Sequence, residues 1–253
     1  MRVMGAQSVP EWRETTVFAS RYSRFIALAG AIAWLAVIVV SDVFVAPSPA
    51  YDAPPAEWST YLQDHSAGSD EALLYAEVFL LALAGVFVGL VCAVLRRAEG
   101  DRGFLSTMAL LFGGVAIAIK VGSGAPILAA IYLNESGLSG EMTRTLFNMN
   151  DAAFVLTFFA NGAMMLAIGA AVLLYRAMPA WLGWLGLAAG LALLAGAPFV
   201  TDDGPGFIGM GLFLLWNIAA SITLFVKWPS YVTGFDGVET EPTRPGVAGA
   251  APA

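Results

Sequence analysis

A lysine inside an apolar run is the residue of this sequence that most needs a chemical explanation. Lys120 is preceded by the four apolar residues Ala116–Ile119 and followed by Val121–Pro126. A lysine at the centre of a membrane helix costs about 2.5–3.5 kcal/mol on insertion scales, and ionisable residues in such helices often mark functional sites. We therefore expect the Lys120 side chain to face other helices, where it finds a carboxylate or backbone carbonyls, or to be neutral.

Three acidic residues can serve as partners of this lysine. Asp42, Glu77 and Asp151 each lie near one end of another apolar stretch. Glu77 and Asp151 belong to the stretches directly before and directly after that of Lys120. These two residues are therefore the first candidates for an ion pair with Lys120.

Polar residues also recur on one face of the apolar stretch that contains Asp151. Asn150, Thr157 and Asn161 are separated by spacings of seven and eleven residues. At 100° per residue, the three side chains lie within about 40° of one another on a helix. An amide that faces lipid has no hydrogen-bond partner, so this face is expected to point into a helix bundle, where Asn217 can join it or bond between helices.

These polar residues allow two interpretations. In the first, Lys120 and one carboxylate form a structural ion pair, and the asparagines hold helices together. In the second, the same set lines a cavity that opens outward and binds a small polar ligand or an ion, or relays protons. Residues typical of irregular helices, Gly122, Ser123, Gly124 and Pro126, follow the lysine and favour the second interpretation, because interrupted helices mark binding sites in transporters.

The elements that would position these residues are membrane helices. The chain of 253 residues is 58% hydrophobic and only 12% charged, whereas soluble domains carry about 25% charged residues. A helix of about 20 apolar residues crosses the hydrocarbon layer. Six stretches satisfy this length, namely Phe25–Ala46, Ala72–Leu95, Phe104–Leu133, Asp151–Tyr175, Trp181–Val200 and Phe207–Val226. The predicted fold class is all-α, a polytopic bundle of six transmembrane helices.

The basic residues predict the orientation of this bundle. All lysines and arginines except Lys120 and Arg144 fall on one side of the six stretches, and an excess of basic residues marks the cytoplasmic side. Both termini are then cytoplasmic. We expect a cytoplasmic tail at residues 1–24, a transmembrane domain at 25–228, and a disordered cytoplasmic tail rich in Gly, Pro and Ala at 229–253.

The first outer loop is expected to contain a short helix. Pro55 suits the start of a helix, and Trp58, Tyr61 and Leu62 follow at spacings that place them on one face. This pattern predicts a helix that lies in the outer membrane interface. It acts either as an aromatic anchor in that interface or as a lid over the mouth of the bundle.

Several classes of function lack the residues that they need. The sequence has one histidine, His65, and one cysteine, Cys92, so a metal site, a haem ligand pair or a Cys–His dyad within the chain is not predicted. We predict no cofactor, and no nucleic-acid partner. No acid–base–nucleophile set is visible, which leaves catalysis as the least favoured class. The expected partners are the lipid bilayer and either a small polar ligand or a second membrane protein.

Two segments resemble a known group of proteins. Asn150–Phe154 and Tyr175–Gly186, with the sequence YRAMPAWLGWLG, are similar to segments of uncharacterised six-span membrane proteins from high-GC Gram-positive bacteria. The resemblance is clearest over residues 142–197. It implies a six-helix bundle in the bacterial plasma membrane and implies no activity. The sequence therefore predicts a membrane protein that binds or transports a small molecule or ion, with a non-enzymatic scaffold as the alternative.

Overall fold

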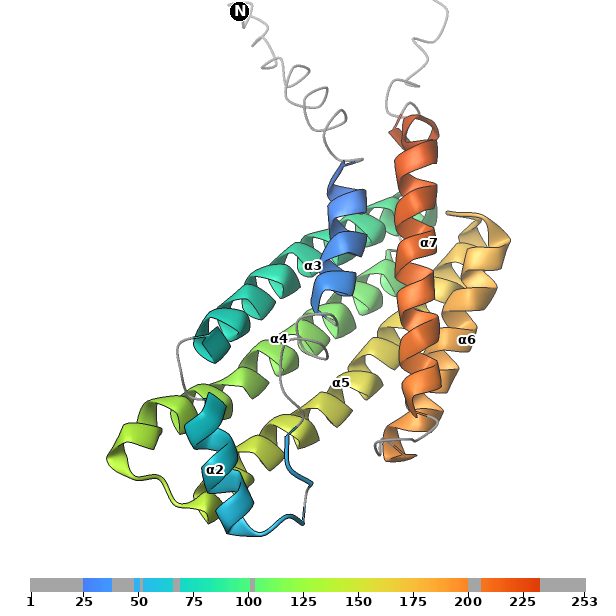
Figure 1. Ribbon diagram of the computed structural model, residues 1–253. Helices are drawn as coiled ribbons and strands as arrows, with labels where there is room; N and C mark the ends of the chain where they lie inside the picture. The colour runs from blue at the N-terminus through green and yellow to red at the C-terminus, as the bar shows by residue number, and fades with distance from the viewer. Residues whose placement is uncertain are drawn as a thin grey trace, which may run out of the picture.

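The chain forms a bundle of helices in a computed structural model that describes residues 25–37, 48–50, 52–65, 69–100, 103–199 and 206–232 (Figure 1). All regular secondary structure in these ranges is helical. The helices are Phe25–Val37, α2 (Pro55–His65), α3 (Ser69–Glu99), α4 (Phe104–Leu133), α5 (Gly140–Tyr175), α6 (Ala180–Gly196) and α7 (Gly206–Val232), with short 3-10 turns at Asn134–Ser136 and Ala197–Phe199.

Four of these helices are long and apolar enough to cross a membrane. They cover Glu71–Glu99, Phe104–Leu133, Gly140–Tyr175 and Phe207–Lys227. The apolar helices Phe25–Val37 and Ala180–Gly196 are shorter, and the 17 residues of α6 span about 26 Å. Residues 38–46 of the first predicted span lie outside the described residues. The long apolar helices are compatible with an integral membrane protein.

The helix Phe25–Val37 lies against both α3 and α7 (Figure 1). The ring of Phe25 meets that of Phe225 at a centroid distance of 5.9 Å, and Trp34 meets Phe213 at 5.0 Å, so this helix runs antiparallel to α7. On the same face as Trp34 and four residues earlier, a Cβ placed on Gly30 would overlap the Phe87 side chain of α3. The bundle is thereby closed between the helix Phe25–Val37 and α7.

Helix α5 begins eleven residues earlier than the predicted start of its span at Asp151. The Ser139 hydroxyl caps the new start by accepting a hydrogen bond from the Met142 backbone N–H at 3.3 Å, and Glu141 follows in the first turn. The hydropathy of the segment predicts where lipid contact begins, whereas the cap decides where the helix begins. Its 36 residues extend over about 54 Å, which exceeds the hydrocarbon layer of about 30 Å.

Helix α2 packs on this additional length of α5. The predicted face of α2 is its contact face, since Trp58 and Tyr61 both pack on Phe147 with ring centroids 5.6 and 5.5 Å away. Trp58 is fully buried in this contact, so its indole is used for packing on α5; the location of α2 in the membrane interface stays a prediction. The fit is close, because a Cβ on Gly140 would collide with the carbonyl of Pro55. We call this side of the bundle the α2 end.

Helices α5 and α6 approach closely along their lengths. A Cβ on Gly190 would lie 2.9 Å from the carbonyl oxygen of Gly162, and one on Gly186 would lie 3.3 Å from the Cα of Gly169. The G-x-x-x-G pair of α6 therefore serves packing inside the bundle. The core around this contact is apolar, and it includes Phe158, Met165, Leu182, Leu193, Phe213 and Leu224.

A buried carboxylate joins α3 to α4 at the end of the bundle opposite α2. Glu99 accepts hydrogen bonds from the backbone N–H groups of Leu105, at 3.0 Å, and Ser106, at 2.6 Å. These N–H groups belong to the first turn of α4, where no helical carbonyl is available to them. The carboxylate thus caps α4 from the preceding helix, while Gly103 takes a left-handed φ of 49° in the turn.

Candidate polar site

The structure contains an ion pair between Lys120 and Glu77. The Lys120 Nζ atom lies 2.9 Å from Glu77 Oε1, a distance typical of a charge-assisted hydrogen bond. Glu77 was one of the two carboxylates favoured by the order of the helices along the chain. The pair joins α4 to α3, which pack antiparallel.

Lys120 lies on the buried side of α4. Gly113, Ala116, Ser123 and Gly124, whose helical positions surround that of Lys120, are all buried. The amine therefore faces the other helices, as the sequence predicts. The pair is nevertheless not sealed, because 19% of the Lys120 side chain and 13% of the Glu77 side chain are accessible.

An aromatic ring from α5 completes the surroundings of the amine. The Lys120 Nζ atom lies 5.5 Å from the centre of the Phe154 ring, a distance at which the ring attracts a cation. On the same helix as the lysine, the Ser123 hydroxyl donates to the Lys120 carbonyl at 2.7 Å. Three helices thus contribute to the immediate environment of this one ammonium group.

The helix that carries Lys120 is continuous. Residues Gly122–Pro126 were expected to loosen it, but α4 runs from Phe104 to Leu133 without interruption, with Pro126 inside it. Packing on both neighbours holds the segment helical, since Gly124 faces Leu74 of α3 and Lys120 faces Phe154 of α5. An interrupted helix therefore gives no support to a binding site here.

The ion pair lies nearer the α2 end than the opposite end of the bundle. Glu77 is 22 residues, or about 33 Å, from the opposite end of α3 at Glu99. Lys120 is 16 residues, or about 24 Å, from the start of α4 at Phe104. Both values exceed half of a hydrocarbon layer about 30 Å thick.

Asp151 and Asn150 lie on α5 close to this pair along the helix. Asp151 precedes Phe154 by three residues, which is nearly one turn. The Asn150 amide donates to Asp151 Oδ1 at 3.3 Å, and both residues are half-buried. Asp42, the third expected carboxylate, lies outside the described residues.

Of the predicted polar face of α5, Thr157 and Asn161 are buried. The Thr157 hydroxyl donates to the Phe154 carbonyl of its own helix at 2.6 Å. Asn161 Oδ1 is different, because it has no hydrogen-bond partner within the described part of the chain. The face therefore holds one amide oxygen whose hydrogen-bonding capacity is unused.

Asn217 does not join this face. Its amide donates to the Phe213 carbonyl of its own helix at 2.8 Å. Asn161 is next to Gly162, which meets Leu194 of α6, and the neighbouring Leu193 meets Gly209 of α7. Asn217 is eight residues from Gly209, which places it about 12 Å farther along the bundle than Asn161.

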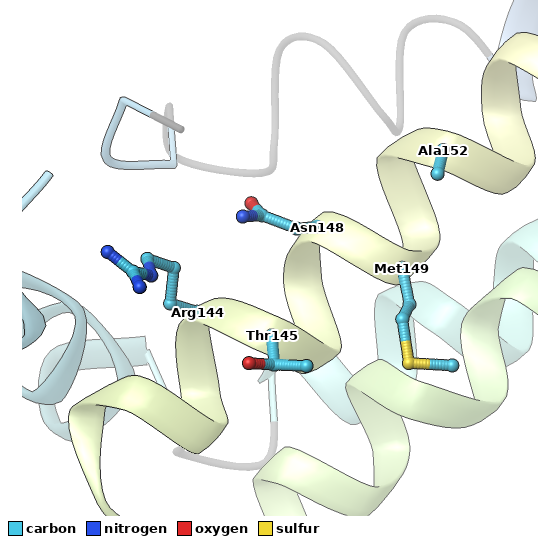
Figure 2. A pocket seen from close by; sticks show the side chains of 5 residues that line it. All are labelled: Arg144, Thr145, Asn148, Met149 and Ala152. Carbon is cyan, nitrogen blue, oxygen red and sulfur yellow. The ribbon is translucent and has the colours of Figure 1, made fainter. Parts of the chain in front are cut away.

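A separate surface depression of about 510 Å³ lies on the part of α5 near the α2 end (Figure 2). It is lined by Arg144, Thr145, Asn148, Met149 and Ala152. At 100° per residue, most of these positions lie on the opposite side of α5 from Phe154, so the depression is distinct from the ion-pair site. In the sequence, Arg144 served only to predict orientation. Its spacing of four residues from Asn148 places both side chains on one face of a helix, and this was the pattern that could have indicated the depression.

The described residues contain no group of three or more His, Cys, Asp or Glu side chains that could hold a metal ion. No family model matches this chain, and no curated protein or solved structure is significantly similar to it. The resemblance of residues 142–197 to bacterial six-span proteins therefore stays a prediction, and the site is interpreted from its own geometry.

Proposed function

We propose that this protein is a six-span protein of the bacterial plasma membrane, with both termini in the cytoplasm, that binds a small polar ligand or ion at the Lys120–Glu77 pair. The apolar helices support the membrane location, and the distribution of basic residues supports the orientation. Asp151 and Asn150, near Phe154 on α5, extend the polar surface of this site towards the α2 end.

The observation that carries the proposal is an inward-facing ion pair that remains partly accessible. A charged pair that only joins two helices is best protected by complete packing, because water and competing ions weaken it. Here the ammonium and the carboxylate can each exchange its partner for an opposite charge on a ligand. A zwitterion satisfies both groups without adding net charge to the membrane interior, and Phe154 offers its ring to a cationic group.

Thermal unfolding of the purified full chain in detergent tests this proposal. Glycine and glycine betaine serve as zwitterionic probes, and sodium acetate and methylammonium chloride as probes of a single charge. We expect at least one probe to raise the melting temperature of the wild type in a saturable manner. The Lys120→Met variant should remain folded and lose this response, because the probe then lacks its cationic partner.

Lys227→Met is the matched control, since Lys227 lies on α7 near the end of the bundle opposite α2. This variant should keep the response of the wild type. A Lys120→Met variant that is still stabilised by the same probe to the same extent would rule out this site.

The alternative function is a membrane scaffold in which the ion pair is purely structural. The 2.9 Å distance and the adjacent Phe154 ring favour it, because the pair is already well satisfied without a ligand. A scaffold predicts that the double variant Glu77→Leu/Lys120→Met still co-purifies with a stoichiometric membrane partner after crosslinking. A ligand-binding protein predicts a monomer whose probe response is lost in the same variant.

A further inference from the structure

Two buried indole groups and two buried amides differ in their hydrogen bonding. The Trp216 indole donates to the Leu182 carbonyl at 2.9 Å, and the Asn217 amide donates to the Phe213 carbonyl at 2.8 Å. By contrast, Trp34 Nε1 and Asn161 Oδ1 are buried and have no hydrogen-bond partner among the residues described. Trp34 is 8% exposed and Asn161 is 4% exposed.

The helical positions of Trp34 and Asn161 lie at similar heights in the bundle. Gly30 packs on Phe87, and the next residue, Val88, meets Gly113 together with Met164, so these positions share one level. Trp34 is four residues from Gly30, and Asn161 is three residues from Met164; both steps run towards the α2 end. The resulting heights above the shared level, about 6 and 4.5 Å, differ by less than half a helical turn.

Both residues also belong to the interior of the bundle. Trp34 is part of the continuous apolar core and packs on Phe213 of α7. Phe158 and Met165, which flank Asn161 on the inward face of α5, are part of the same core. An unpaired donor and an unpaired acceptor, far apart in the sequence, thus belong to one core.

The two groups have complementary chemistry. An indole N–H only donates, and an amide oxygen only accepts. Unpaired buried polar groups are rare in native proteins, because each one loses its hydration without replacement. A small hydroxyl-bearing molecule can accept a hydrogen bond from the indole and donate one to the amide, and buried water makes two to four such bonds.

We propose that a buried hydroxyl group, from a water molecule or a small alcohol, occupies a site shared by Trp34 and Asn161. It accepts from Trp34 Nε1–H and donates to Asn161 Oδ1. The site lies about 6 Å farther from the α2 end than Lys120, since Lys120 is seven residues from Gly113 and Asn161 is three from Met164. It does not depend on ligand binding at the Lys120–Glu77 pair.

A double-mutant cycle measures whether the two groups act through a common partner. Trp34→Phe removes the donor and shrinks the side chain, whereas Asn161→Leu removes the acceptor and enlarges it, so controls with the same volume changes are needed. Each single variant leaves the bound hydroxyl with one hydrogen bond fewer and so weakens its contact with the remaining group, and we expect each to lower the melting temperature. The double variant should melt no lower than the less stable single variant, because removing both partners also removes the need for the hydroxyl.

Trp216→Phe and Asn217→Leu are the matched controls, because each removes a hydrogen bond to a known carbonyl. Trp216→Phe combined with Asn161→Leu, and Asn217→Leu combined with Trp34→Phe, should have additive effects on the melting temperature. Two results would overturn the proposal: additive effects of Trp34→Phe and Asn161→Leu, or a higher melting temperature in both single variants. A higher melting temperature would mean that each buried polar group has no bound partner, because replacing an unpaired buried polar group by an apolar one stabilises the protein.

The indole NMR resonances of protein labelled with ¹⁵N-tryptophan show whether the bound hydroxyl belongs to water or to an alcohol. The Trp34 signal is assigned by its loss in Trp34→Phe, and we expect it to show a cross-peak to water that Asn161→Leu abolishes. Methanol, titrated as the probe, should shift this signal in a saturable manner if an alcohol replaces the water; no shift with the water cross-peak intact assigns the site to water. A Trp34 signal that responds to Asn161→Leu but shows neither water contact nor a methanol shift would indicate a direct bond and reject the site.

Discussion

The two sides of the bundle treat their polar groups differently. Between α6 and α7, the Trp216 indole is bonded to a backbone carbonyl of the neighbouring helix, and the Asn217 amide to one of its own helix. Between α3 and α4, the Lys120–Glu77 pair bonds side chain to side chain and remains partly accessible. Backbone partners cannot leave, whereas side-chain partners can rotate away. The α3–α4 side is therefore the side on which the proposed ligand would compete.

Packing shows the same contrast. In an apolar segment of 18 residues of α5, 67% is buried, whereas 22% of such a segment of α4 is buried. A Cβ on Gly169 of α5 would lie 2.8 Å from the carbonyl oxygen of Gly183, but a Cβ on Gly114 of α4 would meet no atom within 4 Å. The α5–α6 contact leaves no room for a larger side chain or for movement of either helix, so its role is structural.

The largest expected effect comes from breaking the α5–α6 contact. Gly169→Leu should lower the free energy of unfolding by about 3 kcal/mol, because the new side chain meets backbone atoms of α6 that cannot move independently. Urea or thermal unfolding in detergent measures it. Gly114→Leu is the control and should change stability little; equal losses in both variants would remove the contrast between the two sides.

A smaller effect is expected from breaking the ion pair. Glu77→Leu should lower the free energy of unfolding by about 2 kcal/mol, since it leaves the half-buried Lys120 ammonium without its carboxylate. The double variant Glu77→Leu/Lys120→Met should recover most of this loss. The same unfolding experiment measures this effect. If Glu77→Leu leaves the free energy of unfolding unchanged, the ion pair contributes no more to stability than an exposed pair does.

The smallest effect concerns the cap of α4. Glu99→Gln should lower the free energy of unfolding by about 1 kcal/mol, because the neutral amide accepts less strongly from the Leu105 and Ser106 N–H groups. Glu141→Gln, at the exposed first turn of α5, provides a comparison with a carboxylate near a helix start. If both substitutions have the same small effect, the burial of Glu99 adds nothing to its capping role.

Part of the candidate site could be predicted from the sequence. An ammonium group in an apolar stretch must face protein, and the short connection between α3 and α4 makes these helices neighbours, which favoured Glu77 as one of two partners. The inward face with Thr157 and Asn161 followed from helical spacing. The limits of α5 were missed, because hydropathy reports lipid contact and not the capping interaction of Ser139.

The composition and local periodicity of the chain thus determined its helical class, its long apolar helices and the inward orientation of Lys120, since each depends on residues within a few turns of one another. Only the tertiary structure decided that Trp58 packs on α5, that Asn217 bonds within its own helix, and that Trp34 shares a level with Asn161. These outcomes depend on how far each helix slides along its neighbour. That register is set by close contacts such as Gly30 on Phe87, which join residues far apart in the chain.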